Sequence, residues 1–286
     1  MKIRKIYDAA DGSGTPGAIF TASLNEKVIT QEGASLDFIM IGVKGAVSTA
    51  AVVIEDFADL INPLTIRYGG DNRIVATLQE LVALSVFYYG KRPSIGENTD
   101  ATGTDFIGGL KIPIYQKVES GKDLTIQLDR TAVTNIATET VAVTGYWDTG
   151  ETGKKAIHFV RIAHTTSGTA GIETLGSRIV PKGNLIGLVV VQPSGFTDAN
   201  IDTSIQRLKI LENGEEIVHL NDLADAMDMG DVDYVTPNPL ADLVRTLRTF
   251  DLRPVGLDAK GKELTLQFDV QDVSDSVVIL PIIEIA

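Results

Sequence analysis

The amino-acid sequence predicts an all-β protein made of two related halves, and three observations lead to this fold class. Apolar and polar residues alternate with period two in most patterned segments, which is typical of strands with one solvated face. Several of these segments are joined by short glycine-containing turns of the kind that close hairpins. One nine-residue segment recurs 140 residues further along the chain. Antiparallel sheets fit this alternation better than a parallel α/β core, in which strands are apolar on both faces.

The first half contains eight candidate strands, and Leu124–Asp129 shows the alternation most clearly. Gly69-Gly70 separates two of the strands and predicts a tight hairpin. Thr77 and Glu80 have capping-box spacing and predict a short helix that continues to about Val86. The candidate strands are Ala18–Leu24, Leu36–Val43, Ala50–Ile54, Leu64–Tyr68, Arg73–Thr77, Leu110–Tyr115, Leu124–Asp129 and Thr140–Trp147.

The second half contains seven candidate strands, two of which are joined by a predicted Asn213-Gly214 hairpin. Asn221 can cap a short helix through Met227, and Asn238-Pro239 begins an apolar stripe that predicts another helix to Leu247. The candidate strands are Ala156–His164, Leu185–Gln192, Ile205–Leu211, Glu216–Leu220, Phe250–Pro254, Leu264–Val270 and Val277–Ile285.

The recurring segment is Gly121–Asp129, which matches Gly261–Asp269 at six of nine positions. Other paired features follow the same order in the two halves, and their offset drifts from 150 to about 143 to 140 residues, as loop insertions would cause. Both glycine-lysine pairs precede strands and are interpreted as turns. The alternative is a chance match between two common strand sequences, but the shared order of the paired features favours a duplication.

Each half has about 130 residues and seven or eight strands, which is the content of an eight-stranded jelly roll. An immunoglobulin-type sandwich needs only about 100 residues and seven strands. The sequence therefore predicts two tandem eight-stranded jelly rolls with a few short flanking helices. The predicted boundaries are an N-terminal arm over 1–17, a first jelly roll over 18–148, a linker over 149–155 without apolar residues, and a second jelly roll over 156–286.

Charge and composition exclude several functions. The net charge of −13 disfavours non-specific binding to nucleic acid, and no apolar stretch has the roughly 18 residues that span a bilayer. The chain has no cysteine, so disulfides and thiolate nucleophiles are excluded. The one basic run is Lys2, Arg4 and Lys5, which suits contact with lipid headgroups or nucleic acid; a solvated chain end is the alternative.

The candidate sites do not predict catalysis. His158, His164 and His219 fall in strand patterns without metal-ligand spacing, and no Gly-x-Ser-x-Gly elbow is present. We expect no catalytic residues and no cofactor, with one exception. Aspartates gather at Asp222, Asp225 and Asp228 and continue to Asp233; carboxylate oxygens suit Ca²⁺, while a solvated helix face is the alternative.

The segments Leu208–Ile217 and Phe250–Pro254, together with the duplication and the chain length, carry a family resemblance. The chain resembles the double jelly-roll major capsid proteins of icosahedral, often membrane-containing, bacterial and archaeal viruses. This resemblance implies a structural shell protein and not an enzyme, whose three copies form a pseudo-hexameric capsomer. It implies the chain itself as the main partner, then minor capsid or vertex proteins and an internal viral membrane, with no sequence-specific nucleic acid. It places the protein in the virion, assembled in the host cytoplasm.

The same resemblance assigns positions to particular segments. Lys2, Arg4 and Lys5 would face inward, toward the membrane. The loops Arg92–Gly108 and Thr165–Gly176 would be exposed tower or contact segments, and the Asn238–Leu247 helix has no counterpart in the first half.

Two other function classes remain open from the residues alone. One is a tandem jelly-roll carbohydrate-active enzyme of the amidase or glycosidase kind, although one tryptophan and 6% aromatic residues leave little to stack on sugar rings. The other is a virion spike or lectin-like binding protein.

Overall fold

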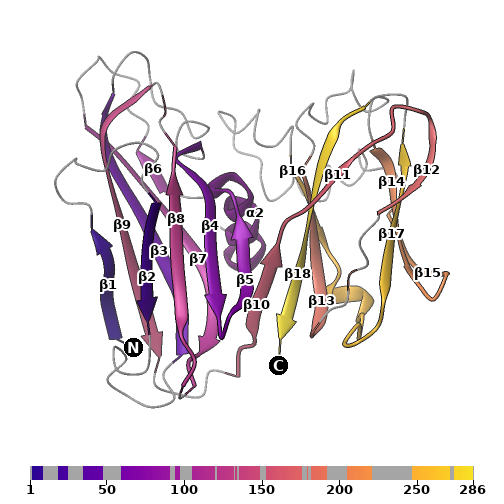
Figure 1. Cartoon of the computed structure of the whole chain (residues 1–286), viewed down its shortest axis with the longest axis horizontal. Helices are drawn as coiled ribbons and strands as arrows, with labels where there is room; N and C mark the ends of the chain where they lie inside the picture. The colour runs from indigo at the N-terminus through magenta and orange to yellow at the C-terminus, as the bar shows by residue number, and fades with distance from the viewer. Residues whose placement is uncertain are drawn as a thin grey trace. The chain divides into compact units, whose positions relative to one another are not determined.

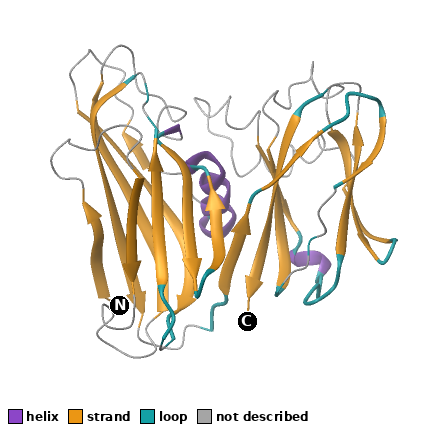
Figure 2. Cartoon of the chain, in the orientation of Figure 1, coloured by secondary structure: helices purple, strands orange, loops and turns teal. Residues whose placement is uncertain are grey.

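A computed structural model describes most of the chain, and every statement below concerns only the described residues. These are residues 2–8, 19–24, 35–47, 59–90, 94–96, 105–119, 121–131, 133, 135–148, 153–175, 179, 182–191, 205–220, 247–270 and 274–285. They form two compact units, residues 1–160 and 161–286. Strands dominate both units (Figures 1 and 2).

The described residues of the first unit form two sheets and the helix α2. One sheet has the order β1-β9-β3-β7-β6, and the other contains β2-β8-β4-β5 with β10 on the far side of β5. All these pairs are antiparallel except β10 with β5. The elements are β1 Lys2–Asp8, β2 Ile19–Leu24, β3 Ser35–Val47, β4 Ile61–Tyr68, β5 Asp71–Ala76, α2 Leu78–Tyr89, β6 Ser94–Gly96, β7 Asp105–Lys117, β8 Leu124–Arg130, β9 Ile136–Asp148 and β10 Ala156–Val160.

The second unit also consists of two sheets, with all strand pairs antiparallel. One sheet has the order β11-β18-β13-β16 and the other β12-β17-β14-β15. The elements are β11 Ile162–Thr165, β12 Gly171–Thr174, β13 Asn184–Val191, β14 Ile205–Glu212, β15 Glu215–Leu220, β16 Leu247–Asp251, the 3-10 turn η1 Arg253–Val255, β17 Leu264–Val270 and β18 Ser276–Ile285.

The strand orders show that the two units have one topology. When β6 and β10 are left aside, eight strands of the first unit remain: β1, β2, β3, β4, β5, β7, β8 and β9. In sequence order they correspond one to one to β11–β18, and this correspondence turns the sheet orders of the first unit into those of the second. Each unit is therefore an eight-stranded jelly roll, and the predicted fold class is confirmed. The repeated segments Gly121–Asp129 and Gly261–Asp269 form the equivalent strands β8 and β17, which alternate between buried and half-buried residues in the same phase.

Local turn and cap chemistry follows the sequence. Gly69 and Gly70 join β4 to β5 with φ of 57° and 89°, and Asn213 and Gly214 join β14 to β15 with φ of 51° and 85°. Two successive positive φ values belong to the type I′ hairpin turn, whose twist matches that of the flanking strands. The Thr77 capping box is present at the start of α2, where both reciprocal hydrogen bonds form.

Each unit buries its own apolar core between its two sheets. In the first unit Ile39, Ile41, Ile66, Ile126 and Leu128 are fully buried. In the second, Leu188, Leu208, Ile210, Leu264 and Ile279 are fully buried within one cluster. The inward positions come from alternate residues of each strand, as the period-two pattern predicts.

Several boundaries differ from the prediction. Lys2–Asp8 pairs with β9 as strand β1, so a separate N-terminal arm over 1–17 is wrong for these residues. The predicted strand Ala156–His164 divides at Arg161: β10 pairs with β5, whereas β11 pairs with β18, so the units part there and not within 149–155. The burial alternation also shifts by one residue here, because β10 buries Ile157 and Phe159 whereas the less exposed residues of β11 are Ile162 and His164.

Short strands account for the other differences. Gly171–Thr174 and Ser94–Gly96 form β12 and β6 inside segments that were expected to be loops. Of the predicted strand Phe250–Pro254, only its first two residues belong to β16, because η1 begins at Arg253.

The predicted strand Ala50–Ile54 and the predicted helix Asn221–Met227 lie outside the described residues. Of the predicted helix Asn238–Leu247 only Leu247 is described, and it is the first residue of β16. No helix among the described residues is long and apolar enough to cross a membrane.

Candidate functional site

Only some of the candidate site residues predicted from the sequence lie among the described residues. Lys2, Arg4 and Lys5 lie on β1, in register with Trp147, Gly145 and Thr144 of β9. The aspartates Asp222, Asp225 and Asp228 lie outside the described residues. Within the described ranges, no group of three or more His, Asp or Glu side chains is arranged to hold a metal ion.

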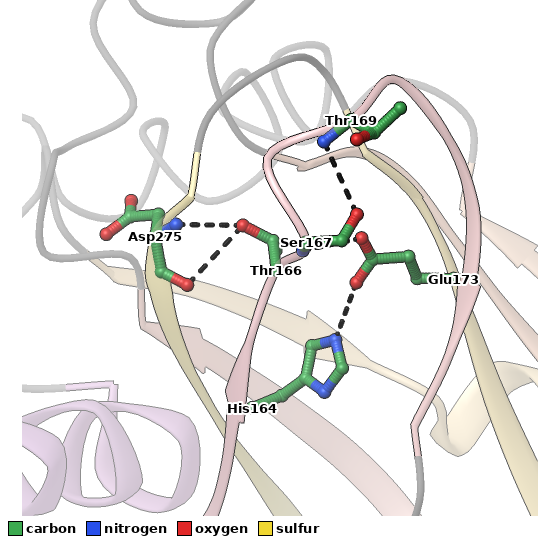
Figure 3. A network of polar contacts seen from close by, with 6 residues as sticks. All are labelled: His164, Thr166, Ser167, Thr169, Glu173 and Asp275. Carbon is green, nitrogen blue, oxygen red and sulfur yellow. Dashed lines mark hydrogen bonds and ion pairs between the residues drawn. The ribbon is translucent and has the colours of Figure 1, made fainter.

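His164 and Glu173 form a polar link between the two sheets of the second jelly roll. His164 Nε2 lies 2.9 Å from Glu173 Oε2, and these residues come from β11 and β12, which end different sheets (Figure 3). The imidazole also lies against the ring of Phe268, with 5.5 Å between ring centroids. Glu173 Oε1 accepts a hydrogen bond of 2.7 Å from the Ser167 backbone N–H. The pair therefore closes one side of the sandwich.

The electrostatics of this link favour an ionised carboxylate. Partial burial acts to raise the pKa of Glu173, but hydrogen bonds from Ser167 and His164 outweigh it, and the pKa is lowered. Next to it, Thr166 Oγ1 accepts from the Asp275 N–H at 2.8 Å, and the Thr166 N–H donates to the Asp275 carbonyl at 2.9 Å. These bonds fix the β11–β12 connection against the start of β18 (Figure 3).

A second ion network lies on the β14–β15 hairpin. Glu216 accepts from Lys209 Nζ at 2.8 Å and lies 3.0 Å from His219 Nδ1. The hydrogen bond from Lys209 lowers the pKa of Glu216, although its partial desolvation opposes this. Both described histidines of the second unit are therefore paired with a carboxylate.

The first unit buries an ion pair that the sequence did not indicate. Arg130 Nη2, at the end of β8, lies 2.8 Å from Glu139 Oε1 on β9, and their side chains are only 2% and 8% exposed. The pair spans the two sheets of the first jelly roll. At the equivalent position of the second unit, β17 ends with the buried Val270. The two jelly rolls thus fill one position with different chemistry.

Aromatic and cationic side chains hold the C-terminal end of α2 against the sheet that contains β3, β7 and β9. Lys111 Nζ lies 4.0 Å from the ring centroid of Phe38 and 3.9 Å from that of Tyr89, the last residue of α2. Phe38 stacks on Tyr146 with 4.3 Å between centroids. Cation–π contacts of this kind are recognisable only once three strands and a helix are brought together.

Asp37 lies next to this cluster and is 7% exposed. Its burial raises the pKa of the carboxyl group, and the charge of Lys154 partly opposes the shift. The alternation of apolar and polar residues does not single out Asp37, because Asp37 occupies a bulge between Leu36 and Phe38 that interrupts the alternation of β3.

Comparisons with known proteins support the fold assignment. No family model and no curated protein matches the chain. The major capsid protein of Sulfolobus turreted icosahedral virus aligns with a TM-score of 0.72 and 11% identity, covering 99% of this chain and 96% of that protein. The major capsid protein of bacteriophage PM2 gives 0.60 and 12%, covering 98% and 96%. The PBCV-1 virus capsid gives 0.57 and 11%, covering 98% and 92%.

At these identities the likeness is one of fold, and it extends over essentially the whole chain. The chain is therefore a double jelly-roll protein. The solved structures that it resembles are those of viral major capsid proteins.

Proposed function

We propose that this chain is a structural shell protein, the major capsid subunit of an icosahedral virion, and that it forms pseudo-hexameric homotrimers. The observation that carries the proposal is the identical strand order of two jelly rolls in one chain, combined with the whole-chain likeness to viral capsid proteins. The aligned structures are shell proteins, so they lend no support to the carbohydrate-active alternative.

The duplication has a direct geometric use. Three chains supply six domains of one topology, so a trimer can fill a position with six neighbours while each covalent chain fixes one pair of domains. The differences between the domains, such as Arg130 against Val270, make alternate positions of this ring chemically distinct. In this role, function depends on interfaces and not on a reaction centre.

Further partners and sites belong to the same proposal. Lys2, Arg4 and Lys5 would give one end of the first jelly roll a positive charge suited to an anionic lipid surface inside the shell. Minor capsid or vertex proteins would contact the capsomers, and assembly would take place in the host cytoplasm. Asp222, Asp225 and Asp228 would bind Ca²⁺ between neighbouring chains; a melting temperature that responds neither to Ca²⁺ nor to a chelator would end this part of the proposal.

The experiment is a mass measurement on the purified chain followed by imaging. Three copies of the 30.6 kDa chain give a particle of about 92 kDa by light scattering or native mass spectrometry. Electron microscopy should then show six-lobed tiles. A chain that stays monomeric at all concentrations would contradict the trimer, and a few dozen copies per virion would assign it to a spike instead of the shell.

A further inference from the structure

Strands at the ends of the sheets expose backbone groups that can pair with another chain. Among the described strands, the sheets end at β1, β2, β6, β11, β12, β15 and β16. Their charges differ sharply. The sequence of β1, KIRKIYD, carries three basic residues and one acidic residue, whereas that of β15, EEIVHL, carries two acidic residues and no Lys or Arg. In each of the other five strands the acidic residues outnumber the Lys and Arg residues by at most one.

The first jelly roll shows how such an edge accepts a further strand. Its strand β5 is the counterpart of β15, and the edge of β5 that faces away from β4 pairs in parallel with β10, in the register Phe159 with Ile74 and Val160 with Val75. On β15, the corresponding edge pairs with no strand in the part of the chain that the structure describes. The topology thus provides an acceptor edge in both units.

We propose that β15 of one copy pairs with β1 of a second copy, in parallel as β10 pairs with β5, and that this contact joins neighbouring chains within the trimer. The two strands have six and seven residues, so they can pair along their whole length. Glu215 is exposed and supplies the acidic charge of this edge, whereas Glu216 is already paired with Lys209 of β14. The basic strand β1 supplies the opposite charge, so in this arrangement Lys2, Arg4 and Lys5 face a neighbouring chain in place of the lipid surface.

The contact joins two different surfaces of the same chain, so it is heterologous and can close into a ring. This inference rests on the proposed trimer and names the strands that form its interface. Opposite charges at the rim of the contact also predict that the trimer weakens at high salt.

Cysteine cross-linking tests the pairing directly, because the natural chain has no cysteine. A chain carrying Glu215→Cys with either Arg4→Cys or Lys5→Cys should give covalent trimers after mild oxidation or treatment with a short bis-maleimide. The two β1 positions cover both faces of that strand. A mixture of chains that carry one cysteine each should give covalent dimers and nothing larger, because the contact runs from head to tail.

The matched control keeps the cysteine on β1 and moves the other cysteine from β15 to β12, the opposite edge strand of the same sheet. Ile172 on β12 is 71% exposed, and Ile172→Cys with Arg4→Cys should give no cross-link above that of single-cysteine chains. Equal cross-linking from Ile172 would overturn the inference. The inference would also be overturned if a thiol reagent modified the Glu215→Cys side chain at the same rate in the monomer and in the trimer, because the proposed contact covers this residue only in the trimer.

A charge exchange gives a second, independent measurement. Glu215→Lys should raise the trimer dissociation constant about two- to fivefold, the effect of one exposed ion pair, and Arg4→Glu in the same chain should restore it. If light scattering finds trimers but the β1–β15 pairs do not cross-link, this inference fails while the proposed function stands. If no trimer forms, the proposed function itself is contradicted.

Discussion

The buried ion pair of the first jelly roll gives the sharpest test of the energetics. Arg130 and Glu139 lie 2.8 Å apart with almost no exposure, and Arg130 Nη1 makes no hydrogen bond among the described residues. Glu139→Ala would leave the guanidinium group buried without its counter-charge. Losing one partner of a buried pair costs about 3–5 kcal/mol, because the remaining charge stays desolvated.

Removing both charges should have the opposite outcome. The second jelly roll fills the position of Arg130 with Val270, which is fully buried. Since Arg130 Nη1 has no hydrogen-bond partner among the residues that the structure describes, the pair recovers only part of its desolvation cost. Arg130→Val with Glu139→Val should therefore be roughly as stable as the natural chain or about 1–4 kcal/mol more stable.

The single tryptophan makes the assay specific to the first unit. Trp147 lies on β9, is 4% exposed, and is the only tryptophan of the chain, so its fluorescence reports unfolding of this jelly roll. With a urea m-value of about 2 kcal/mol/M, Glu139→Ala should lower the midpoint by roughly 1.5–2.5 M. The double variant should unfold at or above the natural midpoint.

Two results would refute this reasoning. A Glu139→Ala midpoint within about 0.5 M of the natural chain would mean that the guanidinium group is solvated or has another partner. A double variant as unstable as the single one would mean that the cost lies in lost packing volume and not in an uncompensated charge.

Three further predictions concern other parts of the fold. Thr77→Ala should lower the free energy of unfolding by about 0.5–2 kcal/mol through loss of the α2 cap, whereas Thr77→Ser should retain it in the same urea titration. Gly183→Ala should sharply reduce the yield of folded protein, because its Cβ would lie 1.9 Å from the carbonyl oxygen of Glu284. Gly42→Ala is the matched control in a solubility assay, because its Cβ would lie 4.0 Å from the carbonyl oxygen of Ala142, an ordinary contact distance. Glu173→Gln should lower the melting temperature at pH 7, and the difference should shrink as the pH falls below about 4.3, because a carboxylate with a lowered folded-state pKa stabilises above its unfolded pKa and loses that contribution on protonation.

Sequence reasoning succeeded where local chemistry decides the structure. The Gly69-Gly70 and Asn213-Gly214 turns, the Thr77 cap and the predicted strand Leu124–Asp129 each depend on a few neighbouring residues. It failed at β12 and at the division at Arg161, because a four-residue strand carries too little periodicity and a strand does not record its partners. The pairs of His164 with Glu173 and of Arg130 with Glu139 each join residues nine positions apart, a separation that implies no contact by itself.

The sequence by itself determined the fold class, the duplication and the inward-facing positions of the repeated strands, because period-two burial and hairpin turns are properties of short segments. Only the tertiary structure decided the strand order of each sheet, the place where the units divide, and the polar links that close each sandwich. These depend on which strands become neighbours, and sheet pairing is set by the burial of whole faces and not by any one strand.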